Sequence, residues 1–133
     1  MPQTENLPEA LPEPVPEAPD FPRPRCADMT EVRAAIDALD RKLVALIAER
    51  LHYIDEAARL KPARDQVHDA GRIADVLAKT RAEALRLGCD SAVVAAAFAA
   101  LVEASIAHEF AAFDRRQAQA FAQNSLAGQG DFP

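Results

Sequence analysis

The apolar positions between residues 32 and 61 repeat with the spacing of a long α-helix that packs along another helix. One row repeats every seventh residue and consists of Val32, Leu39, Leu46, Tyr53 and Leu60. A second row, interleaved with the first, consists of Ile36, Leu43, Arg50 and Ala57. The alternating steps of four and three residues place all of these side chains on one helical face.

The ends of this helix are marked by a capping signal and a stop signal. Asp28 and Glu31 have the spacing of a capping box, and Pro62 disfavours helical geometry at the residue before it. The sequence therefore predicts a helix over residues 29–61. A helix of this length is stable only with a partner along most of it, which favours a helical dimer or bundle.

Two more helices are predicted after a polar loop at residues 62–69. One fits residues 70–87 and stops at Gly88, and the next is capped by Asp90 or Ser91 and runs to about Gln119. The predicted inner face of this last helix is Val94, Phe98, Leu101, Val102, Ser105, Glu109, Ala112 and Phe113. The predicted fold class is all-α, as a three-helix chain with a long first helix.

The composition divides the chain into three segments. Residues 1–27 hold eight of the ten prolines, which predicts a disordered, Pro-rich arm. Residues 28–119 form the predicted helical domain, and residues 120–133 form a flexible C-terminal tail. No apolar run approaches the roughly 20 residues that span a bilayer, and the N-terminus lacks the pattern of a secretory signal, so we expect a cytoplasmic protein.

Charge and motif content narrow the classes of function. The net charge of −6 argues against a nucleic-acid or anionic-membrane partner. Cys26 and Cys89 form no disulfide framework, and the three histidines lack the spacing of metal ligands. The sequence also lacks a P-loop, a dinucleotide fingerprint and a nucleophile elbow. We therefore predict neither a metal site nor a cofactor.

Three cations on the first helix are candidates for binding a small dianion. Arg50 is out of place on an apolar seam, because a buried guanidinium is costly unless an anion meets it. Lys61 follows roughly 16 Å along the helix and about 20° around it, so the two side chains could hold opposite ends of one molecule. Arg33 lies roughly 42 Å from Lys61 and could join them only from a second, antiparallel copy. The alternative is that Arg50 snorkels or pairs with a neighbouring glutamate.

Glu109 is a second misfit, because it follows Ser105 by one turn on an otherwise apolar face. A buried carboxyl group that stays protonated near neutral pH can donate a hydrogen bond. The alternative is a structural ion pair between Glu109 and Arg50 or Arg72.

Taken together, these residues resemble the all-helical chorismate mutase family. The resemblance covers about residues 26–115, and its carriers are VRAAIDALDRKLVALIAER, HYIDEAARLK, Asp69-x-x-Arg72 and Ser105-x-x-x-Glu109. It implies an intertwined homodimer that rearranges chorismate to prephenate without a cofactor. It also implies a site in which Arg50, Lys61 and Glu109 are catalytic, and in which the substrate is bound by Arg33, Asp69, Arg72, Ile73 and Ser105.

The resemblance gives the catalytic residues distinct roles. Arg50, with Arg33 donated by the other subunit, clamps the substrate carboxylates. Lys61 reaches a carboxylate and the ether oxygen, and Glu109 faces that oxygen from the other side, where many members have Gln. Because an ionised Glu109 would repel the negative charge that builds on the ether oxygen, activity is predicted to fall as the pH rises.

Ile73 departs from the mutase pattern and keeps a second activity open. Many mutases carry Glu directly after the second-helix Arg, whereas an aliphatic residue there is similar to the isochorismate-pyruvate lyase branch, which forms salicylate and pyruvate from isochorismate. Asp69 remains available for the substrate hydroxyl, so chorismate mutase is the first hypothesis and the lyase is the second. The third is a non-catalytic helical dimer that binds a partner through its Pro-rich arm.

Overall fold

The computed structural model describes residues 21–128 and contains three α-helices. They are α1 (Met29–Leu60), α2 (Ala70–Arg86) and α3 (Ser91–Ala127), with a short 3₁₀ turn at Arg64–Gln66 between α1 and α2. No strand occurs within the described residues. The prediction of an all-α, three-helix chain with a long first helix is confirmed.

The predicted capping signals operate at both ends of α1. The Asp28 carboxylate accepts a hydrogen bond from the Glu31 backbone N–H at 2.9 Å, and the Glu31 carboxylate accepts one from the Ala27 N–H at 2.8 Å. Lys61 has left the helical conformation, although its N–H still donates to the Ala57 carbonyl. Pro62 therefore ends the helix where the sequence predicts, and Lys61 stands at its C-terminal cap.

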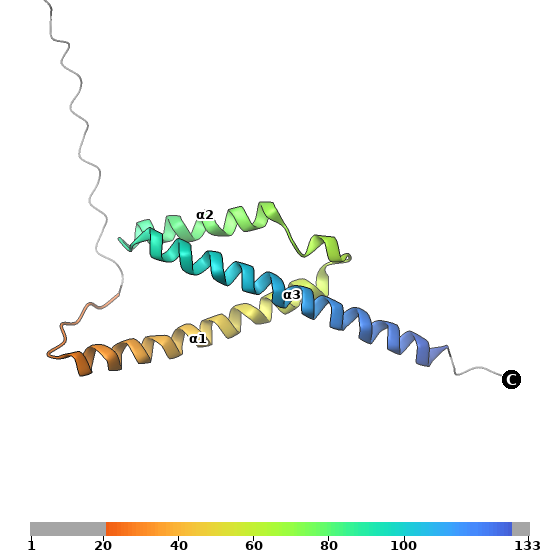
Figure 1. Cartoon of the computed structure of the whole chain (residues 1–133), viewed down its shortest axis with the longest axis horizontal. Helices are drawn as coiled ribbons and strands as arrows, with labels where there is room; N and C mark the ends of the chain where they lie inside the picture. The colour runs from red at the N-terminus through yellow and green to blue at the C-terminus, as the bar shows by residue number, and fades with distance from the viewer. Residues whose placement is uncertain (1–20, 129–133) are drawn as a thin grey trace, which may run out of the picture.

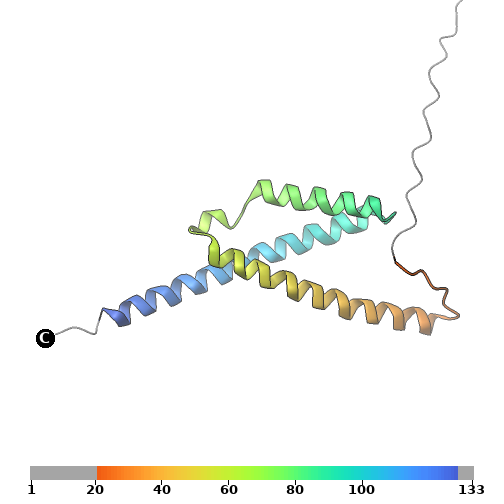
Figure 2. The same ribbon diagram turned by 180° about the vertical axis from the view of Figure 1, so that it is seen from behind.

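The three helices form an open arrangement in which α3 contacts both of the others. Figure 1 shows α3 crossing α1 near the C-terminal end of α1, and α2 running back beside the first half of α3; Figure 2 shows the same arrangement from behind. Gly88, at a φ of 64°, supports the reversal between α2 and α3 in a conformation that favours glycine. The small core lies at the crossing and consists of Ala58, Val67, Ala112 and Phe113.

Helix α3 is longer than the sequence predicts. It continues to Ala127 rather than ending near Gln119, because alanine and glutamine are good helix formers and no glycine or proline intervenes before Gly128. The predicted end of this helix near Gln119 is therefore wrong, since residues 120–127 of the predicted tail are helical, and residues 129–133 lie outside the described residues. Of the predicted arm at 1–27, residues 1–20 also lie outside them, and the described residues 21–27 form no helix or strand.

Helix α3 also departs from the expectation that no segment is long and apolar enough to span a bilayer. An 18-residue window of α3 has a mean hydropathy of 1.7. By length and composition alone, the helix is therefore long and apolar enough to cross a membrane. Only 11% of that window is buried against the rest of the described chain. Two polar side chains of α3, Ser105 and Glu109, are nevertheless buried.

Candidate active site

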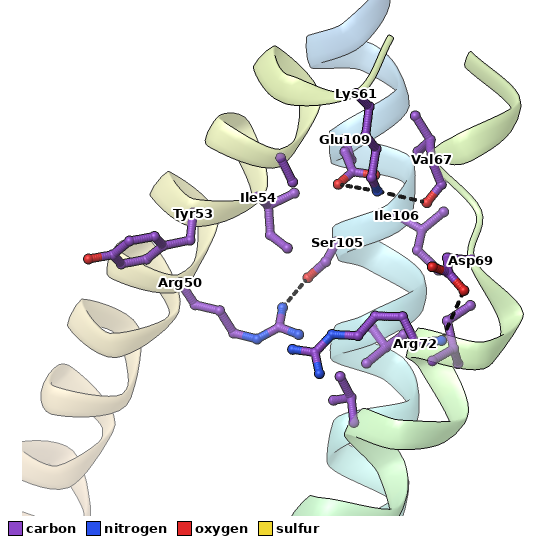
Figure 3. Close-up of a pocket in the computed structure, with 14 residues that line it drawn as sticks. Arg50, Tyr53, Ile54, Lys61, Val67, Asp69, Arg72, Ser105, Ile106 and Glu109 are labelled. Atoms are coloured by element: carbon purple, nitrogen blue, oxygen red, sulfur yellow. Dashed lines mark hydrogen bonds and ion pairs between the residues drawn. The ribbon is translucent and has the colours of Figure 1, made fainter. Parts of the chain in front are cut away.

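A cavity of about 420 Å³ opens between the three helices, on the side of the α1–α3 crossing that faces α2 (Figure 3). Every predicted site residue except Arg33 lines it. These residues are Arg50, Lys61, Asp69, Arg72, Ile73, Ser105 and Glu109. Arg50 on α1 therefore lines the same cavity as Ser105 and Glu109 on α3, although some fifty residues of sequence separate them.

Arg50 and Ser105 connect α1 to α3 at one end of the cavity. Arg50 Nη1 donates a hydrogen bond to Ser105 Oγ at 2.8 Å, and Ser105 Oγ donates its own hydrogen to the Leu101 carbonyl at 2.6 Å. The hydroxyl therefore acts as an acceptor toward Arg50. Because a guanidinium carries five N–H groups, Arg50 retains donors for an anion in the cavity.

Lys61 and Glu109 form an ion pair at the other end. Lys61 Nζ lies 2.8 and 3.1 Å from the two Glu109 carboxylate oxygens and 3.4 Å from the Val67 carbonyl oxygen. Only 5% of Glu109 is exposed, so the ion pair offsets the cost of burying its carboxylate. The hypothesis that Glu109 pairs with Arg50 or Arg72 is wrong, because its partner is Lys61.

Two aspartates hold Arg72 at the start of α2. Asp69 caps the helix by accepting a hydrogen bond from the Arg72 backbone N–H at 3.0 Å. The Arg72 guanidinium donates to Asp75 Oδ2 at 2.6 Å, and Lys79 Nζ donates to the same oxygen at 2.9 Å. Hydrogen bonds from Lys79 and then Arg72 hold the pKa of Asp75 below its usual range, so Asp75 is a carboxylate at neutral pH.

The guanidinium groups of Arg50 and Arg72 point toward one another across the cavity (Figure 3). Two facing cations repel each other, and an anion between them would stabilise both. Aliphatic side chains complete the wall, namely Ile54, Ile73, Val76, Val102 and Ile106. The cavity therefore suits a small molecule with two anionic ends and an apolar ring.

Arg33 is the predicted site residue that the chain does not bring to the cavity. It is exposed on α1, roughly 25 Å along the helix from Arg50. Any contribution of Arg33 to this cavity requires another copy of the chain.

Two contributors to the site were missed by sequence reasoning. The Val67 carbonyl holds Lys61 through a backbone atom, which leaves no sequence signal. Asp75 could have been found, because it lies three residues after Arg72 and four before Lys79 on a predicted helix. Within residues 21–128, no three His, Cys, Asp or Glu side chains gather closely enough to hold a metal ion.

Comparisons with known proteins match the segment of the chain that carries the cavity residues. The family model described as chorismate mutase type II matches residues 32–110, which include all of the predicted site residues. The chain is also similar to isochorismate pyruvate lyase from Pseudomonas aeruginosa, with 27% identity over 84 residues. That alignment covers 63% of this chain and 83% of the lyase.

Proposed function

Because the chain belongs to the chorismate mutase type II family, we propose that it rearranges chorismate to prephenate in the cavity between its helices. The observation that carries the proposal is the convergence of three cations, Arg50, Lys61 and Arg72, on a cavity with an aliphatic wall. This pericyclic reaction requires neither a base nor a nucleophile. Holding a flexible dianion in its reactive conformation and stabilising charge on the breaking C–O bond accelerate it.

The positions of the side chains suggest how the substrate is held. Arg50 and Arg72 bind one carboxylate between their facing guanidinium groups, beside Ser105. Lys61 lies at the other end, near the ether oxygen and a carboxylate. Asp69 uses one carboxylate oxygen to cap α2, and its other oxygen can accept a hydrogen bond from the substrate hydroxyl.

The Lys61–Glu109 ion pair constrains this mechanism. An ammonium group has three N–H donors, and Lys61 Nζ lies within hydrogen-bonding distance of three acceptors, the two Glu109 oxygens and the Val67 carbonyl. Lys61 must therefore release an acceptor before it can donate to the substrate. Protonation of Glu109 weakens its hold on Lys61 and provides a donor to the ether oxygen, so we propose that the protonated form is the active one.

We also propose that the working unit is a homodimer in which Arg33 of each copy completes the cavity of the other. The N-terminal half of α1 supports this, because its seam residues Ile36, Leu39, Leu43 and Leu46 are at least half exposed. An antiparallel second α1 would cover this seam and bring its Arg33 toward Arg50. The sparsely buried face of α3 provides further apolar surface for such a dimer.

A second candidate activity is cleavage of isochorismate to salicylate and pyruvate. Ile73 lines the cavity at the position where many mutases carry a carboxylate, and the similarity to an isochorismate pyruvate lyase favours the same activity. Both reactions place a dianionic ring among the same cations. The position of the substrate hydroxyl distinguishes them, so Asp69 and Ile73 are the residues that we expect to set the preference.

The proposal is tested by supplying chorismate and isochorismate in separate reactions and separating the products by chromatography. Prephenate from chorismate, at the higher kcat/KM of the two reactions, supports the mutase. Salicylate and pyruvate from isochorismate at the higher kcat/KM would reject it in favour of the lyase. If neither substrate is turned over by a folded dimer, both proposals fail and a non-catalytic interaction module remains.

A further inference from the structure

The loop between α1 and α2 is fastened to α3 by a single arginine. Arg64 Nε donates to Asp114 Oδ1 at 3.0 Å, and Arg64 Nη2 lies 3.5 Å from Asp114 Oδ2. The same guanidinium lies over the ring of Phe110, 4.5 Å from its centroid. Arg64 thus combines a two-point ion pair with a cation–π contact, and both partners lie on α3.

The fastened loop carries two groups of the proposed active site. It begins immediately after Lys61 and ends at Asp69, which caps α2. Between them, Val67 is 3% exposed in the core, and its carbonyl oxygen accepts a hydrogen bond from Lys61. The conformation of eight residues therefore determines where the Lys61 ammonium and the Asp69 carboxylate stand.

We propose that Arg64, Asp114 and Phe110 form a loop latch that holds residues 62–69 against α3 and thereby positions Lys61 opposite Glu109. Phe110 and Asp114 follow Glu109 on the same helix, so the latch fixes the loop relative to the carboxylate that Lys61 contacts. Arg64 is a positioning residue in this scheme and does not touch the substrate. The inference rests on the proposed function insofar as Lys61 acts in the reaction.

Asp114 lies beyond residue 110, where the match to the family ends, so the latch uses a residue outside the matched segment. The two charged side chains are more than half exposed, and an isolated surface pair of this kind contributes little. The additional contact with Phe110, and the shortness of the loop, make this pair more effective than an isolated one. We expect the latch to shift the closed-to-open ratio of the loop by about five- to tenfold.

Trypsin can report on the latch independently of any activity. The Lys61–Pro62 bond resists trypsin because proline follows the lysine, so Arg64–Asp65 is the cleavable bond of the loop. Asp114→Ala removes the ion pair of the latch and leaves this bond in place. We expect cleavage after Arg64 to be about five- to tenfold faster in Asp114→Ala than in the unmodified protein, with cleavage elsewhere unchanged. Glu83→Gln, which removes a charged partner of Arg86 on the exposed side of α2, is the matched control and should leave this rate unchanged.

Steady-state kinetics then test the positioning role. We expect Asp114→Ala to lower kcat for the preferred substrate about three- to tenfold while KM changes less, because Lys61 acts on the breaking bond. The exchanged pair, Arg64→Asp with Asp114→Arg, should restore kcat toward that of the unmodified protein. The arginine at position 114 would still lie one turn from Phe110.

Two results would overturn the proposal. Cleavage after Arg64 that is no faster in Asp114→Ala shows that the Arg64–Asp114 ion pair does not hold the loop against α3. Faster cleavage with an unchanged kcat shows that the loop does not position Lys61. If the unmodified protein turns over neither substrate, the proposed function fails and the positioning role fails with it, whereas faster cleavage would still establish the latch.

Discussion

The two halves of α1 share one heptad pattern but have different surroundings. Its C-terminal half crosses α3, where Ala58 is 2% exposed and Arg50 binds Ser105. Its N-terminal half extends away from α2 and α3, and Leu39 and Leu43 remain more than half exposed (Figure 1). A regular apolar seam that is only half covered within one chain is typical of a helix whose uncovered half packs on a second surface.

The charged residues of the two halves also differ in their partners. Arg50 lies in the covered half and Lys61 caps its end, and both have partners on α3. Arg33 lies in the uncovered half and does not reach the cavity of its own chain. In the proposed dimer, the uncovered half of α1 supplies Arg33 to the cavity of the second copy. The cavity beside the covered half receives the second copy's Arg33 in return.

The largest expected effect comes from removing the cation at the centre of the covered half. Arg50→Ala should reduce kcat/KM by about a hundred- to thousandfold, because it removes a fixed donor to a substrate carboxylate. Circular dichroism and size-exclusion chromatography should show an unchanged helical content and oligomeric state. Full activity in a folded Arg50→Ala protein would contradict the assignment of the cavity as the active site.

Mixing variants of the two halves tests whether sites are shared between chains. Arg33→Ala alone should reduce kcat/KM by about ten- to a hundredfold without dissociating the dimer. When Arg33→Ala and Arg50→Ala proteins are refolded together, half of the dimers become mixed and each contains one intact site. Activity should then rise to about a quarter of the unmodified level.

A mixture no more active than the average of its two components would contradict the sharing of Arg33. The control is the same mixture prepared without unfolding, in which exchange of chains is slow and activity should stay low.

A smaller effect is expected from changing the Lys61–Glu109 ion pair at the C-terminal end of α1. Glu109→Gln replaces the charged acceptor of Lys61 with a neutral amide, which holds Lys61 less tightly and can donate a hydrogen bond to the ether oxygen. We therefore expect kcat/KM of Glu109→Gln to be about tenfold higher than that of the unmodified protein at neutral pH. An unchanged or lower kcat/KM in a folded Glu109→Gln protein would reject the proposed role of a neutral group at position 109.

Sequence reasoning located the helices because they follow from local patterns. The heptad rows, the Asp28 cap and Pro62 define α1, and the charged misfits on apolar faces mark the residues that meet in the cavity. Such misfits are informative because burying an unpaired charge is expensive, so a folded chain must place another group beside it.

The pairing of these groups could not be predicted, because it depends on where α3 crosses α1. Several cations were available to Glu109, and the crossing point selects Lys61 rather than Arg50. The backbone contact from Val67 and the loop latch of Arg64, Asp114 and Phe110 depend on the same geometry. The end of α3 was misplaced because small and polar residues were interpreted as a tail, although alanine and glutamine favour helix.

The left-handed turn at Gly88 bears on the order in which this chain folds. Residues 87–90 are all that separates α2 from α3, so these two helices can meet at a small cost in loop-closure entropy. Contacts between α1 and α3 join residues some fifty positions apart and require a much larger loop to close. The α2–α3 hairpin should therefore form first and α1 dock last, which pulsed hydrogen exchange during refolding would show as earlier protection of the hairpin amides. The cavity is then completed only in the final step, so a chain that stalls before it has most of its helices and no binding site.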